Sequence, residues 1–325
     1  MREVVNLKNA LENQEESQKM KTGHELKAKE IDKLTDPLPW NVRVYEEEIN
    51  KLRTENEYGK YCALALCIMF NNHLQEVWLT EDQEIQQIIE NTREACRLSR
   101  GTSRLVLRNE LDSLIHTFLK KDQGYYSTIH DTLFDFLTLY FGRELIVCLI
   151  RNVDGRLFSE RFLFEKRDDS EQFIIIVTEK YQHLYIQRMF DDWSNGKVIM
   201  VFTNINMKSP KFRSKFLKHL KTKDISYQRQ LASTHDHADQ YDPEIETVCD
   251  TMKTSLLYCC TLGDIDMVEW CCSNGADVNF CTNKKESPLY IACEKGYADI
   301  VTMLVAYKAD INTCTNDKES PLCVA

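Results

Sequence analysis

The stretch ESPLYIACEKG, residues 286–296, decides the fold, because its elements recur along the chain at a fixed distance. Within the last 75 residues, four pairs of identical residues are each separated by 33 positions. These pairs are Gly263 and Gly296, Ala276 and Ala309, Asn279 and Asn312, and Ser287 and Ser320. A fixed period of about 20 to 50 residues is typical of proteins built from stacked repeats. We therefore predict that residues 251–325 form an array that binds a partner and performs no chemistry.

Each position of the repeat has a physical reason. Ser287 can cap a first helix, and Pro288 suits its first position, where the missing N–H costs nothing. Gly296 relieves the turn to a second helix, because glycine adopts left-handed backbone conformations without steric penalty. The spacing predicts that Ile300, Val301 and Leu304 form the buried side of this second helix.

This pattern resembles the ankyrin repeat, whose period is about 33 residues. Tyr290 and Leu257 stand where the ankyrin turn usually has histidine, so we expect a hydrogen bond between repeats to be lost. Lys308 replaces the Gly275 of the preceding copy. If this position is left-handed, lysine costs about 1 kcal/mol more than glycine.

The sequence ends at Ala325, which aligns with Ala292 in the first helix of a repeat. Repeat arrays generally need about three units and a polar cap, so we expect the sequence to be a fragment of a longer protein. If Ala325 were a natural end, the last repeat would fray, and Trp270 and Tyr307 would be partly exposed.

The composition is that of an ordinary globular protein, with 43% hydrophobic and 28% charged residues. The formal net charge of −10 disfavours broad nucleic-acid binding. Nine of the thirteen cysteines lie from Cys249 onward, and none has Cys-x-x-Cys spacing. This usage predicts buried reduced thiols in a cytoplasmic protein with no metal site and no cofactor. The longest apolar run, residues 61–70, is too short to span a bilayer.

The pattern as a whole predicts a mainly α-helical protein. Its expected parts are a charged leader (1–40), a helical subdomain (41–100), a winged-helix-like domain (101–166), a helical connector (167–231), an acidic linker (232–250) and truncated ankyrin repeats (251–325). The winged-helix expectation rests on a helix at 104–116 followed by two short strands, 117–120 and 125–129, that form a hairpin. We expect a buried helix at 59–79, further helix at 167–231, and a basic helix at 208–223 whose lysines form one solvated face.

Several runs outside the repeats resemble signalling NTPases of the STAND class that carry ankyrin repeats. They are YCALALCIMFNN (61–72), ENTREACRLSRGTSRLVL (90–107), TIHDTLFDFL (128–137), RMFDDWSNGKV (188–198) and DISYQRQLA (224–232). The resemblance implies that His130, with Asp131 beside it, senses a bound nucleotide. The alternative is that His130 simply starts a helix. No Gly-x-x-x-x-Gly-Lys-Ser/Thr motif is present in this sequence, so a nucleotide site would need a P-loop domain from a missing upstream segment.

Three functions follow from these observations. The first is a protein-interaction module without catalysis, whose unidentified partner contacts the β-turn tips and first helices of the repeats. By analogy with ankyrin recognition, its contacts would be Asn283, Lys284, Lys285, Tyr290, Asn316, Asp317 and Lys318. The second is the regulatory part of a STAND ATPase. The third is nucleic-acid binding by the winged helix, through Arg93, Arg97, Arg100, Arg104 and Arg108.

Overall fold

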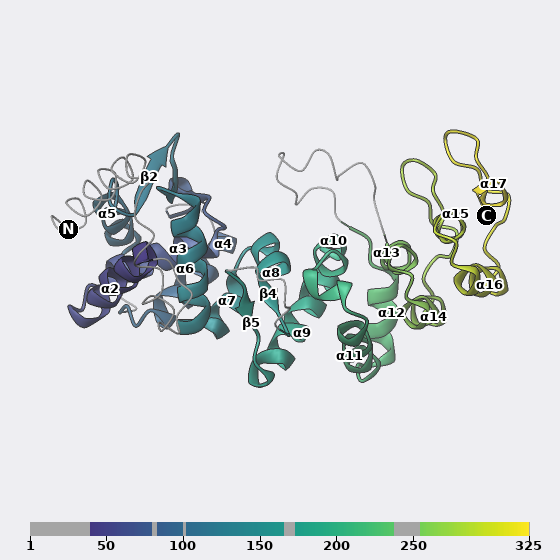
Figure 1. Ribbon diagram of the computed structural model, residues 1–325, viewed down its shortest axis with the longest axis horizontal. Coiled ribbons are helices and arrows are strands. Elements are labelled where there is room, and N and C mark those ends of the chain that lie inside the picture. The colour runs from purple at the N-terminus through teal and green to yellow at the C-terminus, as the bar shows by residue number, and fades with distance from the viewer. Residues whose placement is uncertain (1–39, 80–82, 100–101, 166–172, 237–253, 325) are drawn as a thin grey trace, which may run out of the picture. The chain divides into compact units, whose positions relative to one another are not determined.

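The computed structural model describes residues 40–79, 83–99, 102–165, 173–236 and 254–324, and the side chains of these except 40–43 and 83–84. The expected leader, residues 1–40, lies outside the described residues except for Trp40, where the first described helix begins. The chain is mainly helical and divides into two compact units, Met1–Asp154 and Gly155–Ala325 (Figure 1). We describe each unit by itself. The six-part division stays a prediction.

The N-terminal unit is built around α3 (Tyr58–Met69), whose residues from Tyr61 to Met69 are all buried. A helix that is apolar on every side must be covered on every side. The helices α2 (Trp40–Thr54), α4 (Gln83–Ala95), α5 (Arg104–Ser113) and α6 (Asp131–Glu144) all contact α3. The helix α7 (Ile146–Asn152) packs against α4 and α6.

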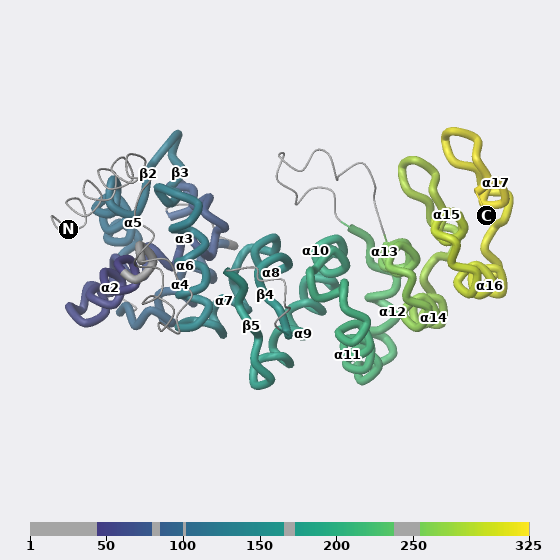
Figure 2. Tube along the Cα trace, in the orientation of Figure 1, coloured from purple at the N-terminus to yellow at the C-terminus, as the bar shows by residue number. Residues whose placement is uncertain are grey.

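A three-stranded antiparallel sheet lies beside these helices in the order β1-β3-β2. Its strands are β1 (Leu74–Gln75), β2 (Leu119–Asp122) and β3 (Tyr125–Thr128), and β2 and β3 are the arms of one hairpin (Figure 2). Gln123 and Gly124 connect them with φ of 46° and 84°, which suits a tight two-residue turn. The hairpin confirms the expected pair of strands, although the first strand begins two residues later than predicted.

The prediction of one buried helix over residues 59–79 was wrong. The helix α3 ends at Met69, and Asn71 and Asn72 take left-handed backbone conformations with φ of 49° and 64°. The chain then enters β1, where Leu74 pairs with Tyr126, and continues into the 3-10 helix η2 (Glu76–Leu79). Apolar periodicity did not reveal this break, because Leu74 and Leu79 are buried in the sheet and η2 instead of in a helix.

The C-terminal unit begins with α8 (Gly155–Arg161), followed by a parallel pair of two-residue strands, β4 (Phe162–Leu163) and β5 (Ile175–Ile176). Four helices and a 3-10 helix follow. They are α9 (Glu179–Ser194), α10 (Val198–Phe202), η3 (Ile205–Lys208), α11 (Pro210–Lys221) and α12 (Ile225–Ser233). Within the described residues 173–231, the expectation of further helix is therefore right apart from β5 and the turns between helices, and residues 167–172 lie outside the described part of the chain. The basic helix α11 also buries its apolar side and exposes Lys211, Lys215, Lys218 and Lys221, as predicted.

Stacked helix pairs complete this unit (Figure 1). They are α13 (Ser255–Leu262) with α14 (Ile265–Ser273), α15 (Pro288–Glu294) with α16 (Ala298–Ala306), and finally α17 (Pro321–Val324). Each first helix packs on the next, α13 on α15 and α15 on α17, while α14 packs on α16. Ile300 and Leu304 are buried as predicted, whereas Val301 is only half-buried.

Helices α9, α11 and α12 contact the first helix pair of the stack, α13 and α14. Trp270 of α14 is only 3% exposed, against the expectation of partial exposure. Its ring centroid lies 5.6 Å from that of Trp193 in α9, and its indole Nε1–H donates to Gln228 Oε1 of α12 at 2.8 Å. Arg213 of α11 forms an ion pair with Asp264 at the start of α14. Trp270 was predicted wrongly because its neighbours, Trp193 and Gln228, come before residue 251, where the repeats were predicted to start.

The start of the expected linker, residues 232–250, belongs to the fold. Asp236 is 7% exposed and accepts hydrogen bonds from Ile199 N at 2.7 Å and from Tyr258 Oη at 3.3 Å. Residues 237–253 lie outside the described part of the chain.

Substituting Trp270 tests this cover. We expect Trp270→Ala to lower the free energy of unfolding by about 3–5 kcal/mol, because it empties a buried ring site and leaves Gln228 without its donor. Urea unfolding followed by circular dichroism measures the loss. Tyr307→Ala is the control, because Tyr307 is 39% exposed. Equal losses in the two variants would contradict the proposed cover.

Candidate functional site: the ankyrin fingers and a recess in the N-terminal unit

The helix ends in the repeats follow the residues that the sequence singled out. Thr254 caps α13 by accepting from Leu257 N at 3.3 Å, and Ser287 caps α15 by accepting from Tyr290 N at 3.1 Å. Gly275 has a φ of 87°, and Lys308 at the equivalent position has a φ of 68°. The condition for strain at Lys308 is therefore met, and lysine costs about 1 kcal/mol there relative to glycine.

Two loops between helix pairs share the same pair of hydrogen bonds. We call residues 281–286 finger 1 and residues 314–319 finger 2. In finger 1 the backbone N–H of Thr282 donates to Glu286 O at 3.1 Å, and Glu286 N donates back to Thr282 Oγ1 at 3.1 Å. Thr315 and Glu319 repeat both bonds in finger 2, at 2.9 Å and 3.2 Å. Each threonine therefore closes its own turn.

The fingers are also bonded to one another. Asn316 of finger 2 donates from its backbone N to Lys284 O and from its side-chain Nδ2 to Asn283 O, both at 3.0 Å. Below the fingers, Asp310 N donates to Asn279 Oδ1 at 2.8 Å. These bonds hold the tips of neighbouring repeats in register, so their exposed side chains form one continuous surface.

Six of the seven predicted contact residues lie exposed at these tips. They are Asn283, Lys284, Lys285, Asn316, Asp317 and Lys318. Lys285 and Lys318 are left-handed, with φ of 60° and 66°. The structure thus brings together the residues chosen from sequence, while their role in binding stays a prediction.

Tyr290, the seventh residue, is only 8% exposed. Its Oη donates to Glu319 Oε2 at 2.7 Å, and this bond to the carboxylate raises the pKa of Tyr290 to about 12. The expected loss of a hydrogen bond between repeats was therefore wrong at this position, because tyrosine reaches the next finger where histidine usually stands. Sequence reasoning did not select Glu319, although it lies 33 residues after Glu286 and so carries the signal of the period.

His130 and Asp131 lie elsewhere, in the N-terminal unit, where β3 leads into α6. His130 occupies the N-cap position with extended backbone, but its side chain makes no capping hydrogen bond. Both side chains are exposed. This placement fits a helix-start residue, and the nucleotide-sensing role stays a prediction.

The arginines chosen for nucleic-acid binding do not form one basic surface. Arg93 is 4% exposed, with its Nη1 2.5 Å from Glu90 Oε1 and its Nη2 2.9 Å from Ser99 O. Arg108 forms an ion pair with Glu76. Arg100 lies outside the described residues. Two of the five guanidinium groups are thus committed to acidic neighbours, which speaks against a footprint on phosphate groups.

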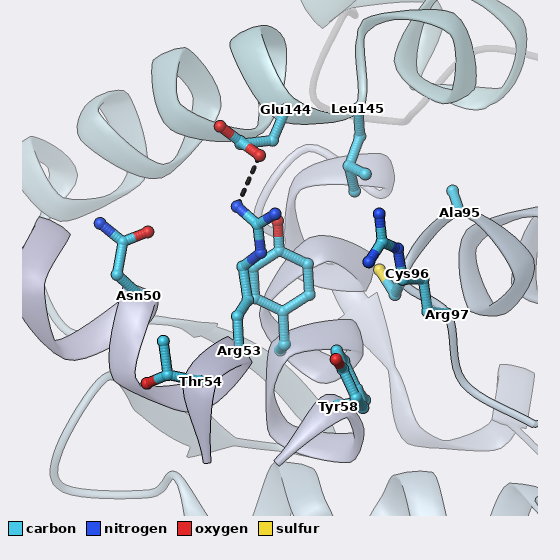
Figure 3. A pocket seen from close by; sticks show the side chains of 10 residues that line it. Asn50, Arg53, Thr54, Tyr58, Ala95, Cys96, Arg97, Glu144 and Leu145 are labelled. Carbon is cyan, nitrogen blue, oxygen red and sulfur yellow. Dashed lines mark hydrogen bonds and ion pairs between the residues drawn. The ribbon is translucent and has the colours of Figure 1, made fainter. Parts of the chain in front are cut away.

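A recess of about 480 Å³ lies in the N-terminal unit among α2, α3, the end of α4 and the end of α6. Its lining is Asn50, Arg53, Thr54, Tyr58, Tyr61, Ala95, Cys96, Arg97, Glu144 and Leu145 (Figure 3). Arg53 Nη1 lies 2.6 Å from Glu144 Oε2, and its guanidinium carbon is 5.7 Å from the ring centroid of Tyr61. Sequence reasoning missed this recess, because its residues come from four segments with no common spacing.

The described part of the chain shows the state of twelve cysteines and can be searched for groups of metal ligands. Nine of its twelve cysteines are buried, and all twelve are free thiols, which confirms the prediction of buried reduced thiols for these nine. Cys259 Sγ lies 3.9 Å from Cys271 Sγ, and burial raises the pKa of the Cys259 thiol. Among the described residues, no three His, Cys, Asp or Glu side chains are placed to hold a metal ion.

Comparison with known families assigns the C-terminal part of the chain. Residues 228–325 match the family model of ankyrin repeats in three copies. These residues are ankyrin repeats. The match begins inside α12, 23 residues before the predicted start at 251, and agrees with the packing of α12 on α13. A comparison with curated proteins finds no match. None of the described helices is both long and apolar enough to cross a membrane.

The close approach of Tyr297 to Gly263 predicts that a larger residue at position 263 destabilises the protein. A Cβ atom at Gly263 would lie 2.7 Å from Cζ of Tyr297, and the backbone there has a φ of 66°. We expect Gly263→Ala to destabilise the protein by about 1–3 kcal/mol, through left-handed strain and overlap with the tyrosine ring. Chemical unfolding of the single variants and of Gly263→Ala with Tyr297→Ala separates the two causes. If the overlap matters, Gly263→Ala costs less when Tyr297 is already alanine; equal costs would leave only the backbone strain.

Proposed function

We propose that fingers 1 and 2 of the ankyrin repeats bind a protein partner, and that the chain performs no catalysis. Ankyrin repeats indicate a protein–protein interaction module. The observation that carries the proposal is the pair of hydrogen bonds from Asn316 to the backbone of finger 1. They hold the backbones of the two tips, which carry six exposed polar side chains, in register before any partner arrives. A preorganised surface binds more tightly because less conformational freedom is lost on association.

The partner contacts are Asn283, Lys284 and Lys285 in finger 1, and Asn316, Asp317 and Lys318 in finger 2. Tyr290 supports them through its bond to Glu319 instead of reaching the partner through its hydroxyl. The buried free thiols are typical of reducing compartments, so we propose a cytoplasmic location.

A charge exchange at the fingertips tests this function. Lys284→Glu combined with Asp317→Lys keeps the net charge and reverses two exposed tip charges without touching a left-handed residue. We expect partner capture to weaken at least about tenfold, about 1.4 kcal/mol, with no change in thermal stability. Quantitative pull-down with the full chain as bait, followed by titration of the captured protein, measures the change.

The matched control is Lys221→Glu with Glu269→Lys, which makes the same exchange on exposed residues of α11 and α14. Retained capture by the fingertip variant would rule out the proposed surface. Equal loss in both variants would point to nonspecific electrostatic attraction.

As a second candidate we propose that the N-terminal unit is the winged-helix arm of a STAND-class signalling protein. It is supported by the order α3, β1, α4, α5, β2, β3, in which helices precede a small hairpin and the sheet order is β1-β3-β2. On this proposal the winged helix begins near residue 58 instead of 101, and His130 follows its last strand. A nucleotide site would need a P-loop supplied outside this sequence.

Isothermal titration calorimetry of the chain with ATP and with ADP tests the second candidate. We expect no heat of binding from either nucleotide, because no P-loop motif is present in this sequence to hold the phosphates. His130→Ala is the comparison variant. Micromolar binding that disappears in His130→Ala would mean that a phosphate site forms without a P-loop, and it would refute the assignment of a P-loop outside this chain.

A further inference from the structure

The last turn of α4 ends in a geometry that favours glycine but contains arginine. Leu98 N donates to Arg93 O at 2.9 Å, and Arg97 N donates to Glu94 O at 3.0 Å. This pair of bonds defines the Schellman motif, whose left-handed position is most often glycine. Arg97 occupies that position with a φ of 60°.

Other helices of this protein show what the motif normally selects. The same two bonds end α9, α13, α14 and α15, with Gly196, Gly263, Gly275 and Gly296 at the left-handed position. Asn56 and Asn71 occupy it after α2 and α3. Among the described helices, Arg97 and Lys308 are the long side chains at this place; both are exposed, and of the two only Arg97 lines the recess. A strained residue kept against this preference points to a role for its side chain.

The side chain of Arg97 projects into the recess described above, where Arg53 enters from α2 (Figure 3). Arg53 is neutralised by Glu144 at 2.6 Å, whereas no ion pair of Arg97 is present within the described residues. Glu144 is the one carboxylate among the ten lining residues, against two guanidinium groups. The recess therefore holds an excess positive charge.

Most of the remaining polar groups of the recess can donate a hydrogen bond; the exception is Thr54, whose Oγ1 already donates to Lys51 O at 3.1 Å. Asn50 accepts through Oδ1 from Tyr140 Oη at 2.8 Å, which leaves its amide NH₂ to donate. Burial raises the pKa of Tyr61, so its hydroxyl keeps its proton at neutral pH. Tyr58 adds a further hydroxyl to the lining. A set of donors with excess positive charge matches a ligand that is rich in acceptor oxygens and negatively charged.

We propose that this recess binds a phosphomonoester, with Arg97 as its principal ligand and Arg53 beside it. A phosphomonoester carries a charge of about −1.5 to −2 at pH 7 and three acceptor oxygens, which a guanidinium group can engage with two parallel bonds. The volume of about 480 Å³ lies within the range of small-molecule pockets, about 300–1,000 Å³, so the recess has room for an organic body as well as the phosphoryl group. The source is either a phosphorylated side chain or a small phosphorylated metabolite.

Calorimetry with the full chain tests the proposal. The probes are inorganic phosphate, glucose 6-phosphate and O-phosphotyrosine, with glucose and tyrosine as unphosphorylated controls. We expect saturable binding of at least one phosphomonoester and none of its unphosphorylated control. Binding of O-phosphotyrosine alone assigns the site to phosphorylated side chains, and binding of glucose 6-phosphate assigns it to metabolites.

Two substitutions of Arg97 separate binding from folding. Arg97→Gly relieves the left-handed strain, so we expect the thermal midpoint to rise by about 2–4 °C while phosphate affinity falls at least about tenfold. Arg97→Gln removes the charge and keeps a side chain, and we expect the same loss of affinity. Lys308→Gly is the matched control, which should raise the midpoint and leave phosphate binding unchanged.

The proposal is overturned by either of two results. One is the absence of saturable binding with both phosphomonoesters, glucose 6-phosphate and O-phosphotyrosine, whether or not inorganic phosphate binds. The other is unchanged affinity in Arg97→Gln.

Discussion

The burial of Trp270 is the contact on which the C-terminal unit depends. A helix pair of an ankyrin repeat cannot bury its apolar surface alone, so each pair needs a neighbour on both sides. At the start of the array that neighbour is not a further copy of the repeat pattern seen from Thr254 onward. Trp193 covers the indole ring, and Gln228 accepts its N–H, so that both the apolar and the polar parts of Trp270 are satisfied. The helices α9 and α12 therefore cover the helix pair α13 and α14.

The same cover explains why the segments before the repeats are not a separate appendage. Arg213 pairs with Asp264, the residue that caps α14 by accepting from Met267 N at 3.1 Å. The rings of Phe202 and Tyr258 stack with centroids 5.7 Å apart. Helices before the matched repeats therefore contact both members of the helix pair α13 and α14, and the ankyrin repeats rest on a base that extends back to α9.

Sequence reasoning succeeded where short-range rules apply. The cap at Ser287 and the left-handed turns at Gly263 and Gly275 depend only on nearby residues and on the repeat period, and the structure has each of them. It failed where a residue's environment is made by distant segments. The sequence pattern gave no sign that Trp270 would be covered, that Tyr290 would reach Glu319, or that Leu74 would leave a helix to pair with Tyr126. Arg97 was missed on both counts, because arginine is not the residue that signals a left-handed helix end and the recess around it exists only in the folded chain.

The bonds between the fingers also bear on how freely the recognition surface can change. Finger 1 contributes only the backbone carbonyl oxygens of Asn283 and Lys284, and every amino acid offers these. Finger 2 contributes the side chain of Asn316, which is specific. Positions 283 and 284 can therefore be diversified, by evolution or in a library of designed binders, without loosening the scaffold, provided that residue 316 remains asparagine. On the proposed function, the side chains at positions 283 and 284 contribute only to the choice of partner, whereas Asn316 both contacts the partner and keeps the fingers aligned.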